Sequence, residues 1–219
     1  TMQRQFGSSL AAIQWVSLMG IVTVSSLSLC FGRAGAIFGQ KRIYKSGVAL
    51  YALGAGFGAV SNSFSTLLLA RLVMAIGLAM AVPMSTAILA TAFEPKSRGR
   101  ALGTFASAIA VGRMTGPTIG GFLLELGGWP WIFWMNFIIG SAVTIAVARI
   151  FRGSGERRQE PFDVWGSLVL LLTYPALLLG LTFAPSAGWT SSFVAGCFVV
   201  ALVGLPIFVW IELRTKKPL

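Results

Sequence analysis

The chain has 219 residues, of which 56% are hydrophobic and only 11% are charged, and its formal net charge is +11. Ordinary soluble domains carry roughly 25% charged residues, and small soluble domains leave much of their surface in water. The composition therefore excludes an ordinary soluble domain and predicts an all-α, polytopic transmembrane helix bundle. The positive charges stand in short clusters between long uncharged runs, as in the loops of a membrane protein, so we expect no nucleic-acid partner.

Few side chains in this sequence could support catalysis or bind a metal. There is no histidine, which removes Ser-His and Cys-His catalysis and the commonest metal ligand. The six Asp and Glu residues lie in loops or at the ends of apolar runs and show no metal-ligand spacing. We therefore expect no enzyme, no metal site and no cofactor. Cys30 and Cys197 lie in apolar runs, where small buried hydrophobic side chains are favoured over a disulfide.

The uncharged runs divide into seven predicted spans, because one crossing of a bilayer takes about 20 helical residues. The run 46–93 is long enough for two crossings, and we place its turn at 61–64, where Ser and Asn side chains bond readily to local backbone. The run 164–211 is also long enough for two, and we expect a break at 184–188, which contains Pro and Gly. The predicted spans are 10–31, two within 46–93, 101–124, 131–147, 165–183 and 193–211.

The basic residues predict the orientation of these spans. Apart from Arg4, Arg71 and Arg113, every Lys and Arg falls on alternate loops and hence on one side of the membrane. The positive-inside rule places that side in the cytoplasm, with the N-terminus of the chain outside and its C-terminus inside, in the inner (plasma) membrane. An odd span count with an outside N-terminus leads us to expect a further helix before this chain. We divide the chain into a partial bundle of five spans (1–152), a cytoplasmic linker (153–164) and two further spans with a basic tail (165–219).

Arg71 and Arg113 are the charges that lie inside predicted spans. An arginine in the hydrocarbon region costs at least roughly 2.5–3.5 kcal/mol, so we expect both to face the interior of the bundle. The alternative for Arg71 is snorkelling to the outer headgroups. No acid lies inside any predicted span, so the partner of these arginines is an anionic ligand, Glu125, or an acid on a helix outside this chain.

Two glycine-rich stretches are candidates for close helix packing. Gly112, Gly116 and Gly120 share one face of the predicted span 101–124, where small residues let helices approach closely, and Pro117 bends that span. A role in sealing a pathway and plain tight packing are both open. The stretch 32–42 is expected to be a short cytoplasmic turn between antiparallel neighbours, with an ordinary basic loop as the alternative.

Several segments together resemble the fourteen-span drug:proton antiporter branch of the major facilitator superfamily. The Gly-x3-Gly-Pro-x2-Gly-Gly pattern of 112–121 is similar to the antiporter motif of that family's fifth helix. The segment 128–136, Gly-Trp-Pro-Trp-Ile-Phe-Trp-Met-Asn, resembles a signature of the same branch. The segment 67–77 resembles the fourth-helix motif, 32–42 the loop between helices two and three, and 14–16 the start of the second helix.

The resemblance implies the incomplete N-terminal half of a major facilitator fold plus two additional helices, with the first helix and the second bundle outside this chain. It also implies a proton-coupled exporter of hydrophobic or cationic drugs, whose partners are the lipid bilayer, protons, the substrate and the missing helices. The usual Asp of the loop motif is Ala36 here, and Met74-Ala75 replaces the Gln-Gly pair of the fourth-helix motif. An exporter of a metabolite or siderophore and a non-transporting seven-span protein are the alternatives. The residues expected to serve transport or coupling are Arg71, Arg113, Gln14, Met74, Gly77 and Asn136, and those expected to serve gating and helix packing are Gly32, Gly39, Lys41, Arg42, Gly112, Gly116, Pro117, Gly120 and Gly121.

Overall fold

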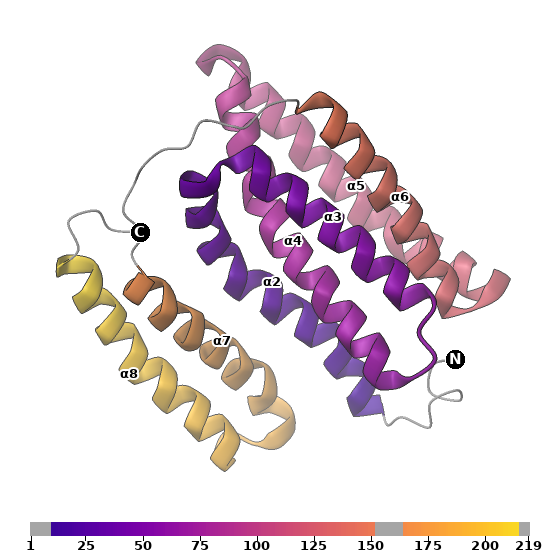
Figure 1. Ribbon diagram of the computed structural model, residues 1–219. Coiled ribbons are helices and arrows are strands. Elements are labelled where there is room, and N and C mark those ends of the chain that lie inside the picture. The colour runs from indigo at the N-terminus through magenta and orange to yellow at the C-terminus, as the bar shows by residue number, and fades with distance from the viewer. Residues whose placement is uncertain (1–9, 152–163, 215–219) are drawn as a thin grey trace.

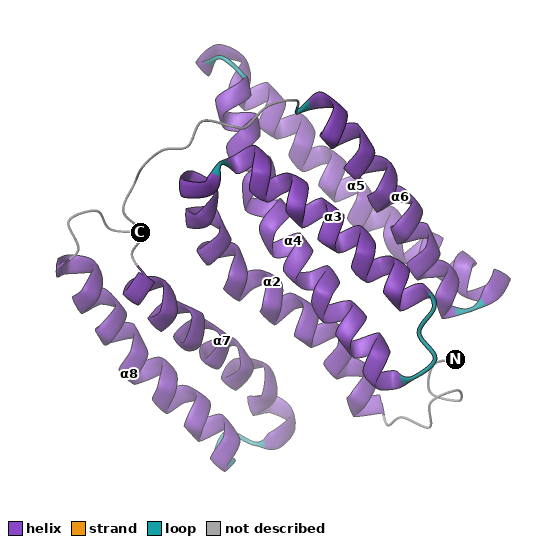
Figure 2. Cartoon of the chain, viewed as in Figure 1, coloured by secondary structure: helices purple, strands orange, loops and turns teal. Residues whose placement is uncertain are grey.

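The computed structural model describes residues 10–151 and 164–214, and these residues form seven α-helices and no strand (Figures 1 and 2). The predicted all-α fold is therefore confirmed, and each predicted span has a helix of its own. The predicted linker at 153–164 lies almost wholly outside the described residues. The helices are α2 (Leu10–Phe38), α3 (Gln40–Ala59), α4 (Phe64–Ala92), α5 (Pro95–Gly127), α6 (Trp129–Ile150), α7 (Val164–Ala187) and α8 (Ser192–Arg214).

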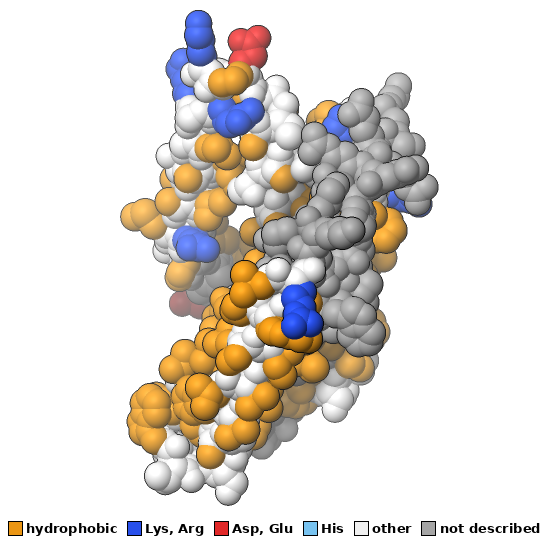
Figure 3. All heavy atoms as spheres, turned by 90° about the vertical axis from the view of Figure 1, so that its left-hand side faces the viewer, with side chains coloured by type: hydrophobic (Ala, Val, Ile, Leu, Met, Phe, Trp, Pro, Cys, Tyr) orange, Lys and Arg blue, Asp and Glu red, His pale blue; other side chains and the backbone are white. Residues whose placement is uncertain are grey.

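Four stretches of the described helices are long and apolar enough to cross a membrane. They are Gly20–Phe38, Phe64–Ala92, Trp129–Ile150 and Ser192–Ile211. Helices α3 and α5 are less apolar, because α3 begins with a cluster of basic residues and α5 has charged residues at both ends and Arg113 within it. The face that α7 and α8 present to the outside shows mainly hydrophobic side chains (Figure 3). Leu202 of α8, for example, is 76% exposed. This pattern is typical of a multi-pass membrane protein.

The predicted turn between the two spans of 46–93 is confirmed at Ser61-Asn62-Ser63. The Ser63 hydroxyl accepts a hydrogen bond from the Thr66 backbone N–H, and the Thr66 hydroxyl oxygen accepts one from the Ser63 backbone N–H. This reciprocal capping box satisfies backbone donors that a helix N-terminus otherwise leaves unpaired. The polar turn therefore fixes the first residue of α4, and with it the register that carries Arg71 two turns into that helix.

The expected turn at 32–42 is shorter than predicted. Helix α2 continues to Phe38, and Gly39 alone separates it from α3. Gly39 has a φ of 95°, which glycine adopts without steric cost, and its N–H donates to the Gly35 carbonyl at 3.0 Å. A chain that can stop a helix with one left-handed glycine needs no longer loop. The break predicted at 184–188 is displaced in the same way: α7 continues through Pro185 and ends before Gly188, whose φ is 86°.

Helices α3, α4 and α6 form the centre of the bundle. Small residues bring α3 against α4: a Cβ added at Gly77 would lie 2.5 Å from the Tyr51 backbone nitrogen and 2.6 Å from the Gly47 carbonyl oxygen. Helix α2 packs chiefly on α4, and α7 and α8 pair with each other while α7 contacts α2 (Figure 1). The largest cluster of buried hydrophobic residues joins α3, α4 and α6 and consists of Ala55, Ala59, Leu67, Met74, Trp129 and Phe133.

Helix α5 packs much less tightly than its neighbours. It has no buried residue, and its contacts with α4 and α6 are sparse. A Cβ added at Gly112, Gly116, Gly120 or Gly121 would meet nothing within 4 Å in the described part of the chain. The glycine face of α5 is therefore not packed against any described helix, and its expected role in gating stays a prediction.

Candidate functional site

A cavity of about 420 Å³ is bounded by four helices and contains both arginines that the sequence places inside spans. Helices α2 and α4 contribute four lining residues each, and α3 and α5 contribute one residue each. Most of the lining is apolar, while guanidinium and hydroxyl groups supply its polar atoms. The lining residues are Gly20, Ile21, Val24 and Ser25 from α2, Tyr51 from α3, Arg71, Met74, Ala75 and Leu78 from α4, and Arg113 from α5.

Arg71 lies at this cavity with an unsatisfied hydrogen-bond donor. Its Nε atom is buried and has no hydrogen-bond partner among the residues that the structure describes. Its guanidinium carbon lies 4.7 Å from the centre of the Phe133 ring of α6, which gives a cation–π contact. This contact holds the guanidinium in place but supplies no hydrogen-bond acceptor. Leaving a buried charged donor unpaired is costly, and the anionic partner expected for Arg71 stays a prediction.

Arg113 reaches the same cavity from α5. Its side chain is exposed, and it lies in the interior of a 33-residue helix, far from both ends. Glu125 follows twelve residues later on the same helix, about 18 Å along the axis. In the described part of the chain, Glu125 makes no ion pair with either arginine. Of the three partners considered from the sequence, this one is therefore ruled out within the fold observed here.

Tyr51 is a cavity residue that the sequence analysis missed. Its hydroxyl donates a hydrogen bond of 2.6 Å to Oδ1 of Asn136, and Nδ2 of Asn136 donates to the Ile132 carbonyl at 2.7 Å. Asn136 therefore does not line the cavity but orients Tyr51 across the α3–α6 contact. The sequence signal for Tyr51 is a polar aromatic residue in an uncharged run, whereas Asn136 is predicted as a site residue from the sequence.

The other predicted residues fall into separate places. Met74 lines the cavity, whereas Gly77 lies at the α3–α4 contact, where its missing side chain allows close approach. Gln14 belongs to α2, but its side chain lies outside the described residues. The residues predicted for gating are not brought to this cavity, and among them Lys41 lies at the other end of α3, with Nζ 5.5 Å from the Phe151 ring centre.

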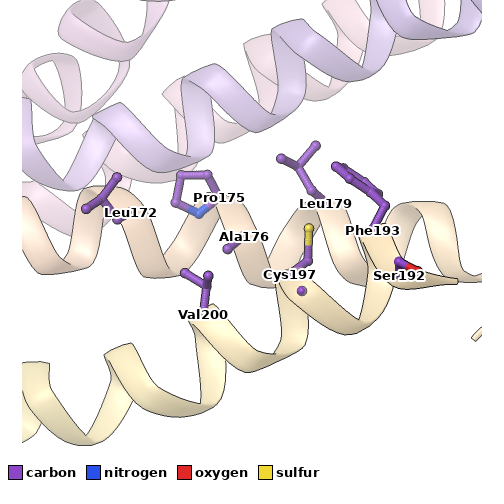
Figure 4. A pocket seen from close by; sticks show the side chains of 9 residues that line it. Leu172, Pro175, Ala176, Leu179, Ser192, Phe193, Cys197 and Val200 are labelled. Atoms are coloured by element: carbon purple, nitrogen blue, oxygen red, sulfur yellow. The ribbon is translucent and has the colours of Figure 1, made fainter. Parts of the chain in front are cut away.

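A second cavity, of about 530 Å³, lies between α7 and α8 and differs from the first in its chemistry (Figure 4). Leu172, Pro175 and Leu179 of α7 line it together with Phe193 and Val200 of α8. No charged side chain lines it, and its Ser192 and Cys197 supply only weak polar groups. The cavity with the two arginines is therefore the candidate functional site.

Comparison with known families assigns this helical architecture. The family model described as "Major Facilitator Superfamily" matches residues 1–214. The chain belongs to the Major Facilitator Superfamily. The predicted family is therefore confirmed, and the seven helices are those of a partial major facilitator bundle.

Individual members of the superfamily are similar over nearly the whole chain. The multidrug resistance protein Stp of Mycobacterium tuberculosis is 30% identical over 99% of this chain and 41% of its own length. The methylenomycin A resistance protein of Bacillus subtilis is 32% identical over 100% of this chain and 47% of its own length. The riboflavin transporter RibZ of Clostridioides difficile is 30% identical over 83% of this chain and 40% of its own length. The chain thus spans less than half the length of these superfamily relatives.

Proposed function

We propose that this chain forms part of the substrate pathway of an inner-membrane transporter that exports hydrophobic small molecules, drugs among them, in exchange for protons. The observation that carries the proposal is the buried, unpaired Nε of Arg71 at a largely apolar cavity between four helices. Apolar walls with a few fixed polar groups are typical of sites that bind small molecules. Membership of the superfamily and the drug-resistance names of two relatives support the same assignment.

Proton coupling needs a carboxylate near Arg71. Helices α2, α3 and α4 contain no Asp or Glu, so we place this carboxylate on a helix outside the chain. Paired with Arg71 it holds a charge within the membrane, and protonation breaks that pair. Loss of this ion pair can shift the balance between inward-open and outward-open states, since each state is stabilised by different contacts. Arg71 in this role sets when the carboxylate takes up its proton.

Transport of a metabolite is the second candidate function. The match to the riboflavin transporter of Clostridioides difficile favours it, because that relative is named for a metabolite and is similar over 83% of this chain. The cavity fits either class of substrate by its apolar walls. Two guanidinium groups at one site oppose a cationic substrate, so hydrophobic compounds without a positive charge are favoured over the cationic ones that the resemblance also implied.

The proposal is tested by dye efflux from cells that express the intact protein. Cells preloaded with a hydrophobic neutral fluorophore should lose it faster than cells with empty vector, and a protonophore should remove the difference. A cationic dye measured in parallel should show the smaller effect. Efflux that is unaffected by the protonophore contradicts proton exchange, and efflux no faster than vector for every dye contradicts drug export.

The proposed orientation is tested by thiol labelling. With Cys30 and Cys197 replaced by alanine, a single cysteine at Ser63 should react with a membrane-impermeant reagent added outside, because the α3–α4 turn lies outside in this orientation. A single cysteine at Ser97, near the start of α5, should react only after the membrane is opened. Labelling of Ser97→Cys from outside in intact cells contradicts the orientation.

A further inference from the structure

The candidate cavity has an excess of positive charge that coupling to one carboxylate would not remove. Arg71 and Arg113 come from different helices and line the same cavity, and none of its lining residues is acidic. A carboxylate paired with Arg71 neutralises one guanidinium and leaves the other. Two guanidinium groups therefore line one cavity without an acidic lining residue, and an anionic group inside the cavity would be attracted to both.

Arg113 is the residue that the proposed coupling leaves without a role. It occupies the interior of α5, where an apolar residue would insert into the membrane at lower cost. It has no ion pair or hydrogen bond in the described part of the chain, and Glu125 is too far along the same helix to reach it. Arg113 lines the same cavity as Arg71 and the apolar residues of α2.

We propose that the cavity binds substrates with an anionic group, a carboxylate, sulfonate or phosphate, held between Arg71 and Arg113. Ser25 adds a hydroxyl donor to the cavity lining, whereas the single hydroxyl proton of Tyr51 is used in its hydrogen bond to Asn136. The apolar part of the substrate packs on Ile21, Val24, Met74 and Leu78, which form the other wall. This inference deepens the proposed transport function and rests on it: it makes the substrate class amphipathic anions.

The test compares two probes that differ only in charge. Dansylglycine carries a carboxylate, and dansylglycinamide replaces it with a neutral amide on the same fluorophore. Binding to the purified intact protein in nanodiscs is followed by energy transfer from tryptophan to dansyl, with empty nanodiscs subtracted. The wild type should bind the acid about tenfold or more tightly than the amide, because hydrogen bonds to a charged group are among the strongest in proteins.

Variants assign the preference to the two arginines. Arg113→Gln should reduce the preference for the acid to less than about threefold, and Arg113→Lys should retain part of it, because lysine keeps the charge without the planar fork. Arg98→Gln removes one positive charge from the same helix outside the cavity and should behave like the wild type. Since Arg113 is exposed and makes no packing contact that folding needs, its variants should retain the wild-type elution profile.

Two results overturn the inference: equal binding of the two probes by the wild type, or an unchanged preference in Arg113→Gln. Nanodiscs that contain anionic phosphatidylglycerol distinguish a lipid headgroup from a free substrate as the source of the anion. If phosphatidylglycerol weakens the binding of dansylglycine, a lipid headgroup occupies the cavity. If it does not, the cavity takes a free substrate. The binding experiment and the dye-efflux experiment can fail independently of each other. Arginine-dependent binding without dye efflux supports this inference and contradicts export. Proton-driven efflux with no preference for the acid supports export and contradicts this inference.

Discussion

Arg71→Leu is expected to abolish proton-dependent dye efflux from cells while the amount of protein in the membrane stays the same. The substitution removes the guanidinium that we propose holds a coupling carboxylate in its charged form, and with it the cation–π contact to Phe133. Leucine inserts into a bilayer more readily than arginine, so insertion should not suffer. Arg71→Lys should be partly active, because it keeps the charge but loses the fork of donors that includes Nε.

The comparison for Arg71→Leu is Arg98→Leu, which removes an arginine from α5 outside the cavity. Efflux rates are divided by the amount of protein in purified membranes, so a loss in Arg71→Leu alone reports on the cavity. If Arg71→Leu and Arg98→Leu both keep the wild-type rate, Arg71 is a residue that snorkels to the headgroups and has no part in transport.

Gly77→Ala is expected to lower the stability of the purified protein by about 1–3 kcal/mol or more, the range for adding atoms to a packed core. The added methyl group would lie 2.5 Å from the Tyr51 nitrogen and 2.6 Å from the Gly47 carbonyl oxygen, and neither backbone atom can rotate away. Helices α3 and α4 must then separate, which also moves Tyr51 away from Arg71. Thermal unfolding in detergent, followed by intrinsic tryptophan fluorescence, measures the loss as a lower melting temperature.

Gly99→Ala is the matched control for this substitution, because a Cβ at Gly99 meets nothing within 4 Å. Alanine is about 1 kcal/mol more favourable than glycine inside a helix, so this variant should be as stable as the wild type or slightly more stable. A melting temperature for Gly77→Ala equal to that of Gly99→Ala contradicts the close α3–α4 packing.

Local signals explain which features of the fold the sequence predicts well. The structure confirms the turn at 61–64. The hydroxyl groups of Ser63 and Thr66 each accept a hydrogen bond from the other residue's backbone N–H, an arrangement that depends only on residues three apart. The predicted ends of α2 and α7 come too early, because the sequence leads us to expect a turn at 32–42 and a break at 184–188. In the structure, a single left-handed glycine, Gly39 or Gly188, ends each helix a few residues later.

In the candidate site, too, features that depend on local sequence are predictable, whereas features that depend on helix packing are not. Arg71 and Arg113 were predicted because a charge inside an apolar run is visible without any knowledge of packing. Their meeting at one cavity depends on how α4 and α5 lie relative to each other, which no local pattern specifies. Tyr51 was missed for the same reason, since its hydrogen bond to Asn136 joins residues 85 positions apart. The glycine face of α5 has no described partner, so its role is still a prediction.

Drug-dependent proton flux in proteoliposomes is the most direct measurement of the central claim, that the cavity around Arg71 belongs to the pathway of a proton-coupled transporter. The intact protein is reconstituted with a pH-sensitive dye inside, and substrate is added at a series of pH values to wild type, Arg71→Leu and Arg98→Leu at equal protein density. The account predicts substrate-dependent proton movement in wild type and Arg98→Leu and none in Arg71→Leu at any pH. Equal flux in Arg71→Leu and wild type at every pH contradicts it.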